Sequence, residues 1–354
     1  MKTEHKGMLS KLNLVHPPIS TRNYILKKKE LEKTFNKAIL YFFCKRKPLI
    51  FHVNSGKDKN NIYFDLIHGN GIDKVSCTLK KENISSTSFT SYSKDKKDYH
   101  EICIKYASGE VATYTPEDIL FKNGKIADNI TIDGDVTKLA CYEVLYVGET
   151  VDQGVSDRLG SHHGLLKIFM KEDIIENYDK AHEIFILAFE NYNIDTETHK
   201  SIPNKPLKRT KEKTSALDIE QAFINLFDKT YNEVKYKTYP DKKDLLSKGK
   251  FNTIIYAINE NIILTHKDIK FIGKNGSLVN NNYSFLIIQN RDMTLFNPTN
   301  KTMIKIKDNG RRVPFKEIPI FEWSEQNKVK QKAMLKTSKN QTKRRIRVKN
   351  TLKH

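Results

Sequence analysis

The sequence lacks the features that would place it in a membrane or direct it out of the cell. Its longest apolar run, from Ala38 to Cys44, is far shorter than the ~18 residues that a membrane-spanning helix needs. The N-terminus is polar and has no apolar core of the kind that a signal peptide carries. These absences predict a cytoplasmic, intracellular protein that does not bind a membrane.

Cysteine is scarce and widely spaced in this chain. The four cysteines are Cys44, Cys77, Cys103 and Cys141, and no two of them form a C-x-x-C pair. This spacing favours neither a zinc site nor a disulfide framework, and it fits reduced thiols inside a cell. The sequence also has no internal repeat.

Acidic residues are too few to balance the basic ones. The chain has 62 Lys and Arg residues against 42 Asp and Glu residues, a formal net charge of +20, and a pI near 9.5. Cations that contact phosphate give affinity for nucleic acid without regard to its sequence, so DNA is the expected partner and RNA an alternative. A genome rich in lysine codons is the competing explanation of the charge. The oligomeric state is not readable from the sequence.

The first 135 residues predict one helix followed by a β-rich domain. Residues 1–24 are polar and are expected to form an irregular arm. Apolar side chains then recur at helical spacing up to a helix end at Pro48; they are Leu31, Phe35, Ile39 and Phe42. Alternating runs predict strands, at Leu49–Val53, Ile62–Ile67, Ile102–Tyr106 and Val111–Tyr114. The polar stretch Asn83–Lys97 is expected to be an exposed loop.

Residues 136–245 read as alternating strands and helices. The predicted strands are Leu139–Val147 and Glu183–Phe189, with a helix between them that starts at Ser156 or Asp157 and runs toward Met170. A second helix carries a clear apolar stripe, formed by Ile219, Ala222, Phe223, Leu226 and Phe227. Ser215 and Asp218 resemble a capping box at its start.

The rest of the chain predicts a second β-rich domain, over residues 246–325, and a basic tail, over residues 326–354. The expected strands are Thr253–Ile258, Ile262–Leu264, Tyr283–Ile288 and Met303–Ile306. Lys328–His354 holds eleven Lys or Arg residues and no Asp or Glu, so this tail is expected to be disordered on its own. The predicted fold class is α+β: a small mixed sheet with helices, flanked by two small β-rich domains and the disordered tail.

Four side chains in the central segment form a plausible set for cleaving a phosphodiester. Arg158 and His162 lie four residues apart in a predicted helix, so they share one face and are able to meet the same phosphate. Glu220 lies at the rim of the apolar stripe, where a carboxylate is able to hold Mg²⁺ or Mn²⁺ with several waters. Tyr146 ends an apolar strand before Gly148 and could orient water.

The ordered set resembles the GIY-YIG nuclease superfamily over about residues 138–240. Tyr146-Val147-Gly148 matches the second half of the signature, and Arg158 matches the arginine that binds the scissile phosphate. His162 matches the histidine one turn later, Glu220 the metal-binding glutamate, and Asn232 the asparagine that supports the site. The resemblance implies a small GIY-YIG-like mixed sheet and hydrolysis of DNA with one divalent ion.

The first tyrosine of the family's pair is not fixed by the resemblance. No Gly-Ile-Tyr sequence lies about ten residues before Tyr146. Because some relatives separate the two tyrosines widely, Tyr114 or Tyr106 could serve. Tyr142 is expected on the same strand and the same face as Tyr146, so it too is a candidate for the site.

Basic residues near the central segment and in the tail are expected to grip flanking phosphates. They are Lys167, Lys205, Lys208, Arg209, Lys211, Lys343, Arg344, Arg345 and Arg347. Two alternatives to a DNA endonuclease remain: a nucleic-acid-binding protein whose nuclease core is inactive, and a nuclease or binding protein directed at RNA.

Overall fold

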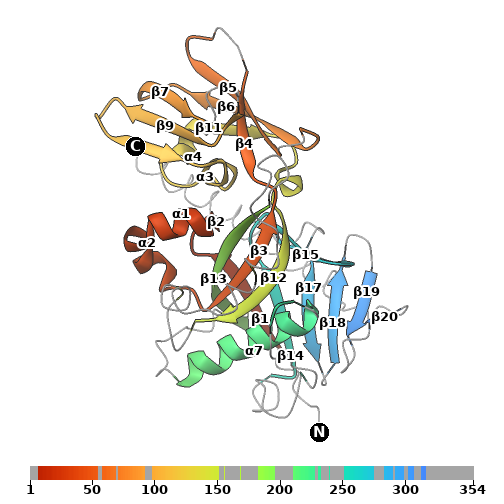
Figure 1. Ribbon diagram of the computed structural model, residues 1–354. Helices are drawn as coiled ribbons and strands as arrows, with labels where there is room; N and C mark the ends of the chain where they lie inside the picture. The colour runs from red at the N-terminus through yellow and green to blue at the C-terminus, as the bar shows by residue number, and fades with distance from the viewer. Residues whose placement is uncertain are drawn as a thin grey trace, which may run out of the picture. The chain divides into compact units, whose positions relative to one another are not determined.

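The computed structural model describes residues 7–54, 58–68, 71–91, 98–150, 155, 168, 182–195, 210–227, 230–232, 239, 251–274, 283–289, 292–298, 302–306 and 312–315. Residues 1–314 form one compact unit. The fold is mixed α+β and rich in strands, with one large curled sheet and few helices among the described residues (Figure 1). Within those residues, no helix combines the length and the apolar character needed to cross a bilayer.

Twelve strands form the large sheet. They are β1 (Gly7–Leu14), β2 (Ile19–Ser20), β3 (Leu40–Arg46), β12 (Cys141–Glu149), β13 (Glu183–Asp195), β14 (Thr253–Ile258), β15 (Ile263–His266), β16 (Ile269–Ile272), β17 (Phe285–Gln289), β18 (Asp292–Asn297), β19 (Thr302–Ile306) and β20 (Arg312–Phe315). The strand order is β16-β15-β12-β3-β13-β1-β14-β17-β18-β19-β20, and β2 pairs with β13. Strand β3 is antiparallel to both of its neighbours, β12 and β13.

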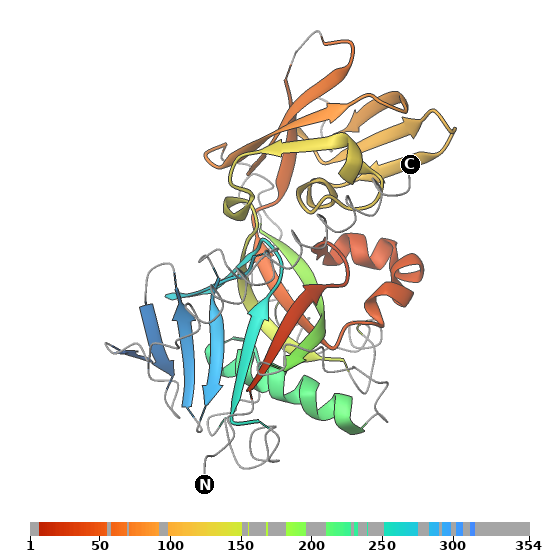
Figure 2. The same cartoon turned by 180° about the vertical axis from the view of Figure 1, so that it is seen from behind.

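Alternate side chains of β3 supply two separate apolar clusters on the two faces of the sheet. Phe42 packs edge-on against Phe223 of α7 (Thr210–Leu226), with ring centroids 5.4 Å apart. Tyr41 and Phe43 belong to the cluster on the other face. That cluster also includes side chains of the short helices α1 (Thr21–Leu26) and α2 (Lys28–Phe35). Figures 1 and 2 show α7 running across the sheet, away from α1 and α2.

A β-rich insertion, residues 47–138, separates β3 from β12. One of its sheets has the order β11-β6-β5-β4-β8 and the other β10-β9-β7. The strands are β4 (Leu49–Val53), β5 (Asn61–His68), β6 (Lys74–Lys80), β7 (Ile84–Thr90), β8 (Asp98–Tyr99), β9 (Glu101–Tyr106), β10 (Val111–Tyr114) and β11 (Ile130–Asp133). The insertion also holds α3 (Pro116–Leu120), α4 (Ile126–Asn129) and a 3₁₀ turn at Val136–Lys138. Phe89 of one sheet packs against Phe51 and Phe64 of the other.

Three local expectations from the sequence are wrong. The helix predicted through Phe42 ends at Phe35, and the residues from Leu40 onward form strand β3, in which every residue except Lys45 is buried. The expected irregular arm contains β1, which pairs with both β13 and β14. The expected loop at 83–97 contains β7, which pairs with β9. In each case, pairing with another strand satisfies the hydrogen-bonding groups of the backbone.

The sheets divide the chain differently from the expected domains. Strands β1 and β3 come from the residues assigned to an N-terminal domain, and β14 to β19 come from the expected C-terminal β domain. All of them lie in the same sheet as β12. The described part of the chain therefore forms one large sheet with its helices, and the insertion between β3 and β12. The basic tail lies outside the described residues.

Arg46 joins the base of the insertion to the large sheet. It lies at the end of β3 and is only 4% exposed. Its guanidinium donates hydrogen bonds to the carbonyl oxygens of Lys47 and Leu139, the residues that begin and follow the insertion. It also donates to the Tyr142 hydroxyl at 2.8 Å and pairs with the Glu117 carboxylate of α3. One buried cation thus holds both ends of the insertion and a helix from its interior.

We expect Arg46→Ala to lower the free energy of unfolding by about 3–5 kcal/mol, because it leaves the buried Glu117 carboxylate without its cation. The matched control is Lys45→Ala, on the same strand. Lys45 pairs with Glu143 at 3.5 Å, and the two side chains are 21% and 44% exposed, so its loss should cost about 0–1 kcal/mol. Urea unfolding of the full chain measures both values. Equal losses from the two variants would contradict the role given to Arg46.

Glu183 lies opposite Arg46 in the pairing of β13 with β3. Burial, and then the neighbouring Glu117 carboxylate, raise the pKa of Glu183 to about 7, although Arg46 opposes the shift. An unfolded glutamate has a pKa near 4.3. Between these two values the native state binds more protons than the unfolded state, so the contribution of Glu183 to stability falls as the pH rises through this window.

We therefore expect Glu183→Gln, which removes this titration, to stabilise the protein more at pH 8 than at pH 5, relative to wild type. Urea unfolding at both pH values gives the two differences in free energy. A difference that stays the same at the two pH values would show that Glu183 does not titrate in this window.

Candidate active site at strands β3 and β12

The pairing of β12 with β3 brings two tyrosines together. Tyr146 lies opposite Phe43, and Gly148 lies opposite Tyr41. The ring centroids of Tyr146 and Tyr41 are 6.0 Å apart, and those of Tyr146 and Phe43 are 5.8 Å apart. Tyr41 is fully buried, whereas Tyr146 is partly exposed.

Gly148 is required by the position of the Tyr41 ring. A Cβ atom built on Gly148 would lie 2.5 Å from the Tyr41 hydroxyl oxygen and 2.5 Å from the ring carbon that bears it. Real Cβ atoms do not approach other atoms this closely. The glycine therefore allows the phenol of one strand to lie against the backbone of the other.

Glu220 projects from α7 toward the end of β12. Its Oε1 atom accepts a hydrogen bond from the backbone N–H of Glu149 at 3.3 Å, and the Glu220 residue is 7% exposed. Carboxylate oxygens are ligands that hard divalent ions prefer in proteins. The donor set therefore fits a hard divalent ion that keeps most of its waters. Among the described residues, no group of three or more His, Cys, Asp or Glu side chains is placed to hold a metal.

Asn232, which follows Glu220 in the sequence, also contacts strand β12. Its amide group donates to the Val147 carbonyl oxygen at 2.7 Å and accepts from the Val147 N–H at 3.1 Å. The Thr230 hydroxyl donates to the Asn232 Oδ1 atom at 2.9 Å. The N–H of Tyr231 donates to the Leu145 carbonyl oxygen at 2.7 Å. These bonds fix the middle of the Tyr146-Val147-Gly148 segment.

The structure does not bring Tyr142 to Tyr146. The pairing of β12 with β3 shifts by one residue between Val144 and Tyr146, so Leu145 is an extra residue in the strand. Such a bulge exchanges the two faces of a strand. Tyr142 therefore lies in the cluster under α7 and accepts a hydrogen bond from Arg46, while Tyr146 faces the opposite cluster. Burial raises the pKa of Tyr142.

The other two tyrosine candidates lie within the insertion. Tyr106 and Tyr114 share a hydrogen bond between their hydroxyls, at 2.8 Å. The tyrosine that the structure places beside Tyr146 is Tyr41, which the sequence analysis missed. The run Leu40-Tyr41-Phe42-Phe43 is rich in residues that favour strands, and this was the available signal.

Asp218 does not cap α7, because the helix already begins at Thr210. The Asp218 carboxylate instead accepts a hydrogen bond from the hydroxyl of Tyr256 on β14, and both residues are buried. The apolar stripe expected on this helix is confirmed, since Ile219, Phe223 and Phe227 are fully buried.

Several predicted site residues lie outside the described residues. They are Arg158, His162, Lys167, Lys205, Lys208, Arg209, Lys343, Arg344, Arg345 and Arg347. Lys211 lies in α7, but its side chain is also outside the described part. Val155 and Ile168, which flank Arg158 and His162 in the sequence, are described and are buried in the same cluster that Tyr146 packs against.

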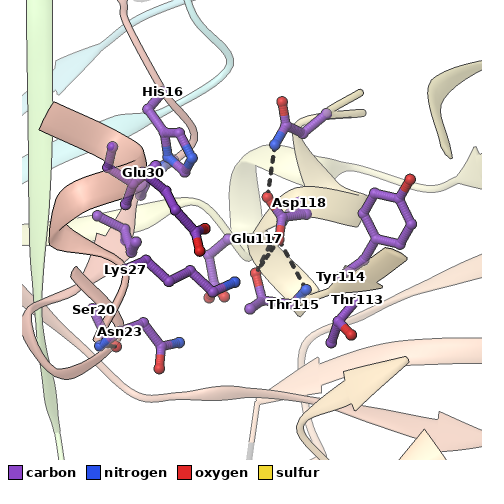
Figure 3. Close-up of a pocket in the computed structure, with 14 residues that line it drawn as sticks. His16, Ser20, Asn23, Lys27, Glu30, Thr113, Tyr114, Thr115, Glu117 and Asp118 are labelled. Carbon is purple, nitrogen blue, oxygen red and sulfur yellow. Dashed lines mark hydrogen bonds between the residues drawn. The ribbon is translucent and has the colours of Figure 1, made fainter. Parts of the chain in front are cut away.

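A separate hollow of about 210 Å³ lies between α1 and α2 on one side and α3 on the other. Figure 3 shows Lys27 and Glu30 on the helix side and Glu117 and Asp118 on the α3 side. Both carboxylates of α3 already have protein partners. Glu117 pairs with Arg46, and Asp118 accepts from Thr115 and Asn123. The Glu117 and Asp118 carboxylates are thus engaged in contacts of the insertion itself.

Comparisons with known proteins identify no relative of this chain. Neither a scan of protein-family models nor searches of curated proteins and of solved structures find a match to this chain. The arrangement of the site therefore rests on its own geometry.

We expect Asn232→Ala to destabilise the protein by about 1–3 kcal/mol for each buried backbone group of Val147 that it leaves unpaired. The control is Asn191→Ala on β13. Asn191 is only partly buried, and its hydrogen bonds, at 3.5 Å and 3.4 Å, are long. Thermal unfolding followed by circular dichroism compares the two variants. If Asn191→Ala lowered Tm as much as Asn232→Ala, the hydrogen bonds from Asn232 to Val147 would not contribute more to stability than those of Asn191.

Proposed function

We propose that this protein is a metal-dependent endonuclease that hydrolyses phosphodiester bonds in DNA, with a core of the GIY-YIG type. The observation that carries the proposal is that Tyr146 and Tyr41 pack together on one face of the paired strands β3 and β12, while Glu220 and Asn232 bond to the backbone of β12 at Glu149 and Val147. Tyr146, Tyr41, Glu220 and Asn232 come from four separate segments of the chain, yet all four lie at the paired strands β3 and β12. A tyrosine pair, one carboxylate and a supporting asparagine are the parts that the resemblance implies.

Chain connectivity supports a place for the arginine in the same site. Val155 is buried in the cluster that Tyr146 packs against, and Arg158 follows it by three residues. Three residues of chain span at most about 11 Å. An arginine tethered at this distance is able to meet a phosphate that lies over Tyr146, and its guanidinium suits bidentate binding of phosphate oxygens.

The proposed chemistry divides among these side chains. Tyr146, which is partly exposed, orients the water whose oxygen attacks phosphorus, and the buried Tyr41 positions the Tyr146 ring. Arg158 neutralises the charge that gathers on the phosphoryl oxygens. His162 accepts the proton that the attacking water loses. A divalent ion bound at Glu220 would stabilise the leaving oxygen as its bond to phosphorus breaks.

One observation favours the second candidate function, a nucleic-acid-binding protein with an inactive nuclease core. Tyr41 is 0% exposed, and Glu220 is 7% exposed, so neither is open to a bulky substrate. A binding protein would need only the basic surface and not these groups. An RNA-directed nuclease is distinguished from a DNA nuclease by substrate alone, because phosphate contacts do not separate the two.

Incubation of the purified protein with supercoiled plasmid and Mg²⁺ or Mn²⁺ tests the proposal. We expect Tyr146→Phe, Glu220→Gln and Arg158→Ala each to slow nicking by roughly 10²-fold or more. Tyr192→Phe is the control, because Tyr192 is an exposed tyrosine on β13 and its loss should leave the rate unchanged.

Cleavage that survives all three substitutions would place the active site elsewhere in the chain. Absence of cleavage by wild type, on DNA and on RNA, would favour the inactive nuclease core. Cleavage of RNA but not DNA would support the proposed active site but show that the substrate is RNA.

A further inference from the structure

Helix α7 is held by polar contacts on two opposite flanks. Asp218 and Glu220 are two residues apart, so their side chains leave the helix about 200° apart around its axis. Glu220 reaches the N–H of Glu149 at the end of β12. On the far flank, Asp218 accepts a hydrogen bond from the Tyr256 hydroxyl of β14. The helix therefore spans the sheet between these two strands.

A second contact reinforces the flank that faces away from Glu220. Asn225 follows Asp218 by seven residues, which returns it to nearly the same side of the helix. Its amide donates to the carbonyl oxygen of Tyr239 at 3.1 Å, and Asn225 is 8% exposed. Asp218 and Asn225 thus form a polar row opposite Glu220.

Tyr256 is well suited to act as a hydrogen-bond donor. Its side chain is fully buried, and burial, followed by the nearby Asp218 carboxylate, raises its pKa well above the usual value. A raised pKa favours the protonated hydroxyl, which is the form that donates to Asp218.

Apolar packing selects which face of α7 is buried, but it defines the rotation of the helix less narrowly than hydrogen bonds do. Phe223 contacts Phe42, Tyr256 and Phe271, at centroid distances of 5.4 Å, 6.3 Å and 5.5 Å. Such packing is favourable but not directional, whereas a hydrogen bond prefers a narrow range of distance and angle. The polar contacts therefore set the rotation, and the rotation sets where the Glu220 carboxylate lies.

We propose that Tyr256, acting through Asp218, is a positioning residue for the Glu220 carboxylate and for the divalent cation that it binds. Strand β14 then belongs to the catalytic unit rather than to a separate recognition module, although it lies outside the segment that resembles the nuclease superfamily. This inference rests on the proposed function. A misplacement of about 1 Å in a reacting group is able to reduce a rate by on the order of 10²-fold.

The test compares Tyr256→Phe with wild type in two assays on the full chain. The first measures Mn²⁺ binding without DNA by isothermal titration calorimetry. The second measures plasmid nicking against Mn²⁺ concentration. We expect Tyr256→Phe to raise both the dissociation constant and the half-saturating Mn²⁺ concentration by about tenfold or more.

Two controls separate positioning from general loss of stability. Ile254→Val removes one buried methylene from the same strand, so it lowers Tm without a polar change. Tyr63→Phe removes another tyrosine hydroxyl that donates to an aspartate, Asp58, at 2.9 Å within the insertion. Neither substitution should change the affinity for Mn²⁺. An equal loss of affinity in Ile254→Val and Tyr256→Phe would overturn the proposal.

The two assays also distinguish this inference from the proposed function. Mn²⁺ binding that Glu220→Gln abolishes and Tyr256→Phe weakens, without cleavage of any nucleic acid, would support the positioning role and refute the nuclease. Wild-type Mn²⁺ affinity in Tyr256→Phe would overturn the positioning role, whatever the nuclease result. Absence of Mn²⁺ binding by wild type would overturn it as well, because there would be no site to position.

Discussion

The antiparallel pairing of β3 with β12 is the constraint on which the rest of the site depends. It sets Gly148 opposite Tyr41, and the absent side chain of the glycine is the space that the phenol occupies. The same register places Tyr146 against the rings of Tyr41 and Phe43. It also determines where the insertion must leave and re-enter the sheet, which is where Arg46 binds both of its ends. A shift of one residue in this pair would separate the tyrosines and reverse both faces.

The sequence predicted well those strands whose side chains alternate between core and solvent. Strands β4, β5, β9 and β10 of the insertion lie where that pattern placed them. The failure at β3 has a physical cause. A strand buried on both faces reads as a continuous apolar run, and periodicity alone does not separate such a run from a buried helix. Because Ile39 and Phe42 continued the spacing of the preceding helix, the strand was missed, and Tyr41 was missed with it.

The faces and partners of strands were harder to predict than their existence. The bulge at Leu145 places Tyr142 and Tyr146 on opposite faces, and nothing in the alternation of β12 marks the extra residue. The pairing of β1 with β14 joins segments about 240 residues apart in the sequence, so composition gave no sign that they share a sheet. Glu220 and Asn232 bond to the backbone of β12 at Glu149 and Val147, and no local pattern in the sequence indicates these long-range contacts.

The net positive charge of the chain is unevenly distributed between the insertion and the C-terminal third. Between residues 47 and 138 there are 13 Lys and Arg residues and 13 Asp and Glu residues, whereas residues 251–354 hold 21 basic and 7 acidic ones. The insertion is therefore electrically balanced and adds no net attraction to a phosphate backbone. In the proposed function, most of the attraction would come from the C-terminal third, which also includes β14, the strand whose Tyr256 bonds to Asp218 of α7. Binding of a polyanion and placement of the Glu220 carboxylate would then involve the same part of the chain.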